Sequence, residues 1–257
     1  MPLAVYFLQD SLIFYRQPLA ASQREALARR PDVAEVWLTA ADGTRVHAWH
    51  LKAGPALVLY FGGNAEEVSW MIEEARTEAP GVSWLLLDYR GYGLSEGSPS
   101  QKALIADALA LYDHAAGLPG VDSGRLYAFG RSLGSGVAVA LAAQRPLRGL
   151  ILSTPYDSLR AVAARYYWFL PVRWLLKHPF DSVALAPRLD TPLLCLIAGR
   201  DEVVPPAHAE RLYEAWRGPK RRVFLASATH NTTDEAAEFW PSIRAFLGNP
   251  GDNPAAR

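Results

Sequence analysis

The stretch Gly130-Arg131-Ser132-Leu133-Gly134 decides the fold of this 257-residue chain. It is a G-x-S-x-G pattern that lies between an apolar run, 126–129, and a run of small aliphatic residues, 135–144. The first run predicts a buried strand and the second predicts a packed helix. A sharp turn between a strand and a helix is typical of a nucleophile elbow, in which the serine backbone is strained and glycines tolerate the crowding on either side. We therefore expect the Ser132 hydroxyl to stand exposed at the edge of a sheet.

A serine nucleophile needs a base, and the base needs an acid that orients it. In this architecture the order along the chain is Ser, then Asp or Glu, then His. Asp201 follows the apolar strand predicted at 193–198, and His230 lies in the polar loop after the strand predicted at 222–225. Because the carboxyl ends of parallel strands lie along one edge of a sheet, we expect Ser132, Asp201 and His230 to converge.

Asp157 and His208 are the alternatives for the acid and the base. Asp157 follows the preceding strand, a position from which some hydrolases take their acid. His208 falls within a helix predicted after two prolines, so we expect it on the surface. Asp88 also ends a predicted strand, and we interpret it as a structural residue that bonds the loop containing Arg90. Arg131, inside the elbow, is interpreted as structural and as the partner of a nearby acid.

The composition sets limits on the class of protein. Half of the residues are apolar, which is enough to fill a sizeable core, and the formal net charge is zero. A net charge of zero gives no support for binding to nucleic acid or to an anionic membrane surface. The single cysteine, Cys195, lies in a predicted strand, where we expect it to fill the core. A chain with one cysteine cannot form an internal disulfide, which fits a reducing compartment and predicts a cytoplasmic protein. No cysteine or histidine spacing indicates zinc, and we expect no cofactor or metal.

Strands and helices alternate along most of the chain. The segments 35–38 and 44–51 alternate in polarity around Asp42-Gly43, which predicts an antiparallel hairpin. Ser98-Pro99-Ser100-Gln101 resembles a capping box with proline at the first helical position, and opens a helix that ends near residue 116. The other predicted elements are strands at 56–61, 83–87 and 149–152 and a helix at 66–79. The pattern predicts an α/β fold with a mostly parallel sheet of about eight strands flanked by helices.

Three segments lie outside this regular alternation. Residues 1–34 are predicted to form helical segments that cover part of the core, with a weak contact to a membrane surface as the alternative, and residues 248–257 are predicted to form a flexible tail. Within the main domain, 35–247, the insertion 154–190 is rich in aromatic residues and prolines and predicts a small helical cap. Its aromatic residues either line an acyl pocket or pack the cap onto the domain.

The motifs together resemble the α/β-hydrolase superfamily, and specifically its Bem46-like branch, which is also labelled serine aminopeptidase S33-like. The resembling stretches lie at 60–65, 88–97, 130–136, 199–205 and 229–231, so the resemblance covers nearly the whole chain. Relatives usually carry His-Gly where this chain has Gly62-Gly63, and they often place glycine where Thr229 stands. Neither departure removes a catalytic group, but the first bears on the geometry of the oxyanion loop.

Such an enzyme needs two backbone amides for the oxyanion. We assign one to Leu133, the residue after the nucleophile, and the other to Asn64, with Gly63 as the fallback. The predicted reaction is hydrolysis of a small-molecule carboxylic ester or thioester, with an apolar acyl group, through an acyl-enzyme on Ser132. Two alternatives stay open. An aminopeptidase or amidase would need an acidic patch for the substrate's amino terminus, and a catalytically silent hydrolase scaffold would bind a ligand or a partner.

Overall fold

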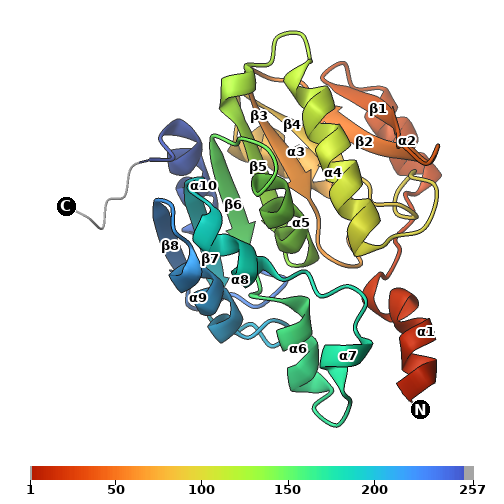
Figure 1. The fold of residues 1–257 in the computed structure, drawn as a ribbon. Helices are drawn as coiled ribbons and strands as arrows, with labels where there is room; N and C mark the ends of the chain where they lie inside the picture. The colour runs from red at the N-terminus through yellow and green to blue at the C-terminus, as the bar shows by residue number, and fades with distance from the viewer. Residues whose placement is uncertain (1, 252–257) are drawn as a thin grey trace.

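A computed structural model describes residues 2–251 of the chain (Figure 1). Residues 1 and 252–257, which include most of the predicted tail 248–257, lie outside the described residues. An eight-stranded sheet crosses the molecule in the order β1-β2-β4-β3-β5-β6-β7-β8. Its strands are β1 (Val33–Thr39), β2 (Arg45–Leu51), β3 (Ala56–Phe61), β4 (Val82–Leu87), β5 (Leu126–Arg131), β6 (Gly149–Ser153), β7 (Leu193–Ala198) and β8 (Lys220–Leu225).

The sheet is antiparallel at one side and parallel elsewhere. Strand β2 pairs antiparallel with β1 and with β4, while β4, β3, β5, β6, β7 and β8 run parallel to one another. The β1–β2 register places Thr39 opposite Arg45, and Gly43 adopts a φ of 81° in the turn between them. A positive φ suits glycine because it has no Cβ. The predicted hairpin and the predicted α/β fold are both confirmed.

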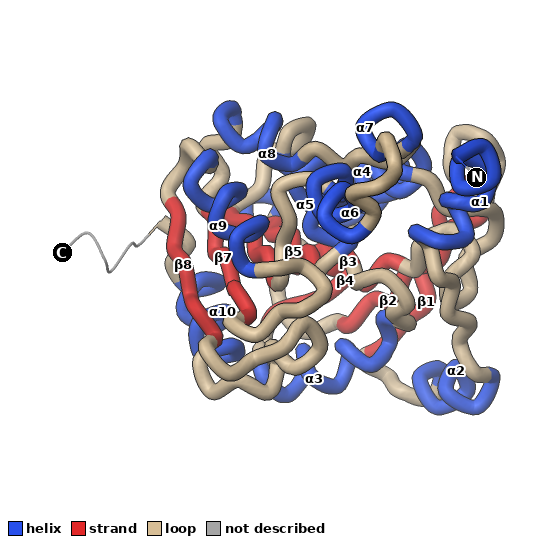
Figure 2. The backbone as a smooth tube through the Cα atoms, turned by 90° about the horizontal axis from the view of Figure 1, so that it is seen from below, coloured by secondary structure: helices blue, strands red, loops and turns tan. Residues whose placement is uncertain are grey.

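Helices cover both faces of the sheet (Figure 2). Helices α3 and α10 lie on one face, and α4, α5 and α9 lie on the other. The helix predicted at 66–79 is divided into a short 3-10 turn, η1 (Val68–Trp70), and α3. The helices are α1 (Pro2–Ile13), α2 (Ala21–Ala28), α3 (Met71–Glu78), α4 (Gln101–Ala116), α5 (Leu133–Ala142), α6 (Leu159–Tyr166), α7 (Val172–Leu175), α8 (Ser182–Leu185), α9 (Pro206–Ala215) and α10 (Phe239–Gly248).

Each face of the sheet has its own core. Leu104 on α4 and Val137 on α5 are fully buried on one face, and Ile72 on α3 and Ile243 on α10 are fully buried on the other. Burying one such side chain away from water stabilises the folded state by about 1.5–3 kcal/mol. Cys195 lies buried in β7 as a free thiol, and burial raises the pKa of this thiol well above its ordinary value. It fills the core, as the sequence predicts.

Helix α4 begins two residues later than the predicted capping box. The Ser100 side chain accepts a hydrogen bond from the Ala103 amide at 3.2 Å, so Ser100 is the N-cap and Pro99 precedes it. Gln101 does not close a box. Its side-chain oxygen accepts a hydrogen bond from the Phe180 amide at 2.9 Å, because the base of the cap insertion lies against this end of α4.

The N-terminal segment is helical, but α1 packs mainly on the cap insertion rather than on the central core (Figure 1). The Gln9 side chain donates to the Leu175 carbonyl at 3.0 Å and accepts from the Lys177 amide at 2.7 Å, which ties α1 to α7. Phe14, after α1, and Leu27, in α2, are the side chains that enter the two cores. Among residues 2–251, none of the helices is long and apolar enough to cross a membrane.

The insertion 154–190 forms the short helices α6, α7 and α8, as predicted for a cap. Tyr156 at its base is buried, and its hydroxyl donates to the Leu133 carbonyl at 3.1 Å. Most of the other aromatic side chains are exposed: Tyr166, Tyr167, Trp168, Phe169 and Trp174. Two of them still fit the predicted roles, because the Tyr166 hydroxyl donates to the Val203 carbonyl at 3.1 Å and Tyr167 lines an apolar groove. The predicted roles do not describe Trp168, Phe169 and Trp174. The turn between α6 and α7 projects from the domain (Figure 1).

Candidate active site

Ser132 occupies the sharp turn between β5 and α5. Its backbone has φ 49° and ψ −115°, a conformation that residues other than glycine rarely adopt. A Cβ at Gly130 would collide with the Gly134 carbonyl, and one at Gly134 would collide with the Phe61 carbonyl. The crowding that the pattern predicts is therefore present, and the packed sheet and helix hold the serine in a strained backbone.

The His230 ring lies between Ser132 and Asp201. Its Nε2 is 2.8 Å from the Ser132 Oγ, and its Nδ1 is 2.7 Å from the Asp201 Oδ2. The other carboxylate oxygen of Asp201 accepts hydrogen bonds from the amides of Val203 and Val204 at 2.9 and 2.7 Å. These backbone donors fix the orientation of the carboxylate. Three loops that are remote in sequence thus bring the three side chains into one hydrogen-bonded chain at the carboxyl edge of the sheet.

The loop after β3 brings backbone amides to the same place. A Cβ on Gly63 would lie 3.5 Å from the Cβ of Ser132, so this loop adjoins the elbow. The Gly63 amide already donates to the Glu66 carboxylate at 2.6 Å. Among the hydrogen bonds within residues 2–251, none is donated by the amide of Asn64 or Leu133. The geometry favours Asn64 and Leu133 over Gly63 as the pair of oxyanion donors.

Glu66 is a buried residue that the sequence analysis did not name, and it joins the oxyanion loop to the elbow. Besides the Gly63 amide, its carboxylate accepts hydrogen bonds from the Tyr60 hydroxyl at 2.5 Å, Arg131 at 3.0 Å and the Trp70 indole at 3.1 Å. Burial, reinforced by the Glu66 charge, raises the pKa of Tyr60 well above its ordinary value. The sequence analysis expected Arg131 to pair with a nearby acid, and that acid is Glu66. The presence of an arginine inside the elbow was the sequence feature that pointed to such a partner.

The two alternatives from the sequence, Asp157 and His208, pair with each other. The His208 Nδ1 lies 2.8 Å from the Asp157 Oδ1, and the Arg211 guanidinium donates to the other carboxylate oxygen at 2.6 Å. His208 is 5% exposed, so the expectation of a surface residue was wrong. It lies on the inner face of α9, where it ties that helix to the base of the cap insertion. Neither side chain is hydrogen-bonded to Ser132.

Asp88 is structural and bonds the backbone of the loop that contains Arg90, as expected, but it does not bond the Arg90 side chain. Its Oδ2 lies 2.8 Å from the His47 Nδ1 and accepts from the Leu94 amide at 3.0 Å. Arg90 instead donates to Asp107 through two nitrogens, at 2.8 and 2.9 Å. The reason is the direction of the loop, which carries Arg90 away from the strand end and toward α4.

A cleft of about 540 Å³ opens over Ser132 and His230. Burial raises the pKa of Glu67, which lines this cleft, above its ordinary value. The aromatic residues of the cap do not line the cleft, so they form no acyl pocket at Ser132 within the described part of the chain. The remaining lining residues are polar and apolar in similar measure and come from the loop after β3, the elbow and the loops after β7 and β8: Asn64, Ala65, Glu66, Trp70, Arg131, Val203 and Asn231.

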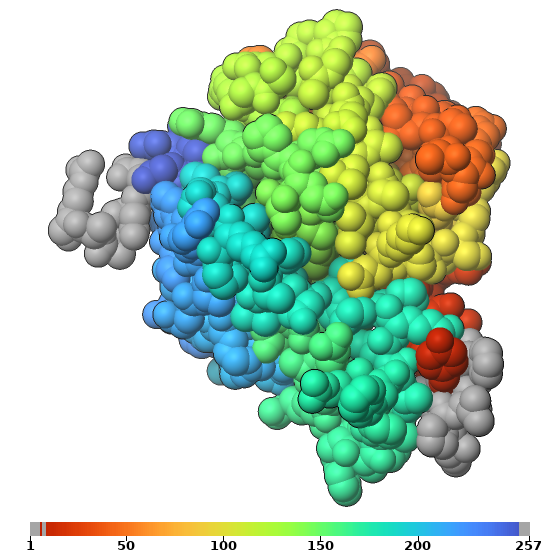
Figure 3. All heavy atoms as spheres, in the orientation of Figure 1, coloured from red at the N-terminus to blue at the C-terminus, as the bar shows by residue number. Residues whose placement is uncertain are grey.

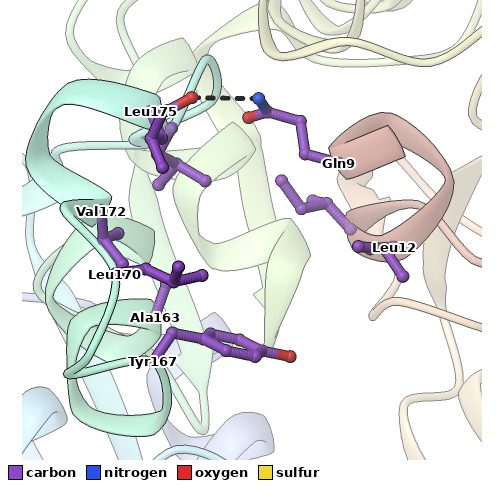
Figure 4. Close-up of a pocket in the computed structure, with 9 residues that line it drawn as sticks. Gln9, Leu12, Ala163, Tyr167, Leu170, Val172 and Leu175 are labelled. Atoms are coloured by element: carbon purple, nitrogen blue, oxygen red, sulfur yellow. Dashed lines mark hydrogen bonds between the residues drawn. The ribbon is translucent and has the colours of Figure 1, made fainter. Parts of the chain in front are cut away.

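An apolar groove of about 160 Å³ lies between α1 and the cap (Figure 4). The far end of α1 leads from this groove toward the cleft, since the Tyr15 amide donates to the Asn64 side chain at 2.8 Å. Most of the groove's lining is aliphatic: Gln9, Leu12, Ile13, Ala163, Tyr167, Leu170, Val172, Leu175 and Leu176. A second and more strongly apolar surface therefore lies beside the cleft.

The fold and the arrangement at the sheet edge are those of an α/β hydrolase. The chain belongs to the family described as serine aminopeptidase, S33, whose model matches residues 55–183. An uncharacterized protein of Mycobacterium tuberculosis is 37% identical over 251 residues, which cover 95% of this chain and 88% of that protein. The α/β-hydrolase domain-containing protein WAV2 of Arabidopsis thaliana is 32% identical, over 83% of this chain and 78% of its own length.

Solved structures share the fold at low sequence identity. An α/β hydrolase from Vibrio vulnificus has a TM-score of 0.74 at 19% identity, covering 95% of this chain and 94% of that one. The esterase Pf2001 of Pyrococcus furiosus has a TM-score of 0.72 at 20% identity, covering 92% and 96%. A puromycin-hydrolyzing peptidase of Mycobacterium tuberculosis has a TM-score of 0.69 at 19% identity, covering 85% of this chain and 39% of that one. Esterases and a peptidase thus share the architecture.

Proposed function

We propose that this hydrolase cleaves carboxylic esters or thioesters through an acyl-enzyme formed on Ser132. The observation that carries the proposal is the unbroken chain from the Ser132 hydroxyl to His230 and on to the buried Asp201 carboxylate. An alcohol is a weak nucleophile unless an adjacent base takes its proton. The proposal requires no cofactor, and its partner is a small-molecule substrate.

The geometry supports the following sequence of steps. With Nδ1 protonated and donating to Asp201, the His230 Nε2 accepts the Ser132 proton while the Ser132 oxygen attacks the acyl carbonyl. The oxyanion of the tetrahedral intermediate accepts hydrogen bonds from the Leu133 and Asn64 amides. The C–O or C–S bond then breaks, and the leaving alcohol or thiol takes its proton from His230. Water repeats these steps to release the carboxylic acid and restore Ser132.

An apolar acyl group remains part of the proposal, but its support has changed. The mixed lining of the cleft gives no strong reason to prefer long acyl chains, whereas the mostly aliphatic groove beside α1 does. We propose that the cleft holds the ester bond and that an acyl chain extends toward this groove. The cysteine-poor composition supports a cytoplasmic location.

Hydrolysis of an amide next to a free amino group is the second candidate. The family description and the peptidase neighbour point to it, and the structure places a carboxylate, Glu67, in the cleft rather than in the cap. A carboxylate in a cleft can hold a substrate ammonium group. If this is the function, Glu67→Gln raises KM for amino-acid anilides and leaves KM for neutral esters unchanged.

A fluorophosphonate probe tests the proposed nucleophile. We expect covalent labelling of the wild type and of Ser123→Ala, a control at an exposed serine, and no labelling of Ser132→Ala. Turnover of nitrophenyl esters should fall at least ~10⁴-fold in Ser132→Ala and in His230→Ala. No labelling of the folded wild type would favour a silent scaffold that binds a ligand.

The same proteins, assayed on a panel of substrates, test the reaction class. The panel contains nitrophenyl esters of increasing chain length, acyl thioesters and amino-acid anilides. A higher kcat/KM on esters or thioesters supports the first candidate, and a rise with chain length supports the apolar acyl group. A higher kcat/KM on amino-acid anilides than on esters and thioesters supports the second candidate, amide hydrolysis, in place of the first.

A further inference from the structure

The turn between α6 and α7, together with α7 itself, exposes an unusual set of large aromatic side chains. Trp168 is 81% exposed, Trp174 80% and Phe169 64%. The Phe169 ring packs edge-on against the rings of Tyr167 and Trp168, with centroids 6.4 and 5.9 Å apart, so the side chains form one cluster. We call Tyr167, Trp168, Phe169 and Trp174 the aromatic tip. Single exposed apolar residues are ordinary, but a contiguous exposed cluster marks a surface that another phase or molecule covers.

The aromatic tip is continuous with the apolar groove. Tyr167 belongs to both, and Leu12 on α1, which is 67% exposed, lines the groove from the opposite side (Figure 4). The cap insertion and α1 lie together at one end of the molecule, and the insertion projects there as a convex knob (Figure 3). A convex apolar knob beside an open groove suits insertion into a soft surface better than contact with a flat protein face.

The segment that carries the tip is rich in basic residues, two of which pair with acids from outside it: Arg160 lies 3.9 Å from Asp181, and Lys177 lies 3.8 Å from Asp10. The segment 159–178 contains Arg160, Arg165, Arg173 and Lys177 and no Asp or Glu, although the whole chain has a formal net charge of zero. Among the described residues, neither Arg165 nor Arg173 forms an ion pair, and the Arg173 guanidinium lies 5.6 Å from the centroid of the Trp174 ring. The formal net charge of the whole chain is zero and gave no support for binding to an anionic surface. It does not show that the positive charges of Arg165 and Arg173 lie in the segment that carries the tip.

We propose that the aromatic tip and its flanking arginines dock this protein on the surface of an anionic lipid bilayer. Indole and phenol rings favour the interface because one part of each ring is apolar and the other is polar. Arginine stems lie along apolar surface while the guanidinium groups reach anionic headgroups. Each basic residue near such a surface contributes a few-fold in affinity, and each aromatic side chain that enters the interface contributes more. The docked orientation turns the groove beside α1 toward the acyl chains.

Co-sedimentation with vesicles tests this proposal independently of any hydrolase activity. The vesicles consist of phosphatidylcholine alone or of phosphatidylcholine with about one third phosphatidylserine. We expect the wild type to bind the anionic vesicles at least ~10-fold more tightly than the neutral ones. The triple variant Trp168→Ser, Phe169→Ser, Trp174→Ser should lose at least ~10-fold in affinity for the anionic vesicles. Phe224→Ser, at a half-exposed ring on β8, is the matched control and should bind like the wild type.

A second variant separates the charge from the rings. Arg165→Gln with Arg173→Gln should reduce binding to anionic vesicles ~10-fold and leave the weak binding to neutral vesicles unchanged. Unfolding midpoints in urea confirm that each variant is folded. Failure of the wild type to bind anionic vesicles, or equal binding by the triple variant, overturns the proposal. So does a dimer in sedimentation equilibrium that the triple variant loses, because the tip is then covered by a second copy.

Discussion

Three buried Asp–His pairs lie near the carboxyl edge of the sheet, and the two that follow β6 and β7 differ in what surrounds the carboxylate. The Asp201–His230 and Asp157–His208 pairs have nearly the same separation, 2.7 and 2.8 Å. The second oxygen of Asp201 accepts backbone amides, whereas that of Asp157 accepts the Arg211 guanidinium. A short Asp–His distance therefore does not identify a proton relay by itself.

The difference is electrostatic and geometric. A carboxylate that is already paired with a guanidinium stabilises a neighbouring imidazolium ion less, because the guanidinium offsets part of its negative charge. Asp201 forms no ion pair with an Arg or Lys among residues 2–251, so its charge is available to His230 if that ring takes the Ser132 proton as we propose. The other ring nitrogen of His230 faces the Ser132 hydroxyl, while His208 lies in a helix and ties α9 to the cap.

The largest expected effect is the difference in kcat between variants of the two aspartates, Asp201 and Asp157. Asp201→Asn should lower kcat for a nitrophenyl ester ~10²- to 10⁴-fold, because the imidazolium formed during attack loses its counter-charge and the ring its tautomer. Asp157→Asn should change kcat by no more than a few-fold. Steady-state kinetics on folded proteins decide the point. An equal loss in the two variants would break the comparison and return Asp157 to the list of candidate acids.

Glu66 extends the comparison to a third carboxylate, one that is paired inside the site. Glu66→Gln leaves the mostly buried Arg131 without a counter-charge, so we expect the free energy of unfolding to fall by about 3 kcal/mol. Because the oxyanion loop is no longer fixed to the elbow, kcat/KM should also fall at least ~10-fold. Urea denaturation and ester kinetics measure the two effects. Glu73→Gln, in an exposed ion pair, is the control, and a stability loss with unchanged kcat/KM would make Glu66 purely structural.

His50 shows what burial does to a histidine that has no carboxylate partner. Burial, reinforced by Lys52 and His114, lowers the pKa of His50 from 6.5 to about 4. The folded state holds the neutral ring, so the unfolded chain binds the proton more readily, and stability falls as the pH drops from 6.5 toward 4. The full shift is worth about 3 kcal/mol, which partial solvation reduces to about 2 kcal/mol. Urea unfolding at about pH 7 and pH 4.5 should show a smaller acid loss for His50→Gln; the same loss as in the wild type contradicts this.

The smallest effect concerns Arg211, the residue that distinguishes the second Asp–His pair. Its side chain is half exposed, so its ion pair with Asp157 contributes about 0.5 kcal/mol or less. Arg211→Met should lower the urea midpoint slightly and leave kcat unchanged. A change in kcat would mean that Asp157 and the reaction are coupled.

The regular part of the fold could be predicted from residue patterns because those patterns record burial directly. The continuous apolar runs became the central parallel strands, and the Asp42-Gly43 turn became the β1–β2 hairpin. The elbow was predictable for a similar reason, since the crowding around Ser132 excludes a Cβ at Gly130 and Gly134. The side chains of Asp201 and His230 were found because both follow strand ends.

The errors concern polar and aromatic residues whose surroundings come from elsewhere in the chain. His208 was expected on the surface. Its burial costs little free energy because Asp157, from another loop, forms a hydrogen bond with its ring. The aromatic residues of the cap were expected to pack or to line a pocket, but Trp168 in the projecting turn and Trp174 in α7 are exposed. Glu66 was missed because its partners come from different elements: Tyr60 from β3, Gly63 from the loop after β3 and Arg131 from the end of β5.

The sequence by itself determined the elements, their alternation, the strained elbow and the order of Ser132, Asp201 and His230, because glycine positions and apolar periodicity act locally. Only the tertiary structure decided which aspartate meets which histidine, which amides stay free for an oxyanion, and which apolar side chains find no cover. Those outcomes depend on distances between remote loops, and a buried charge or an exposed ring is defined by its neighbours in space rather than in sequence.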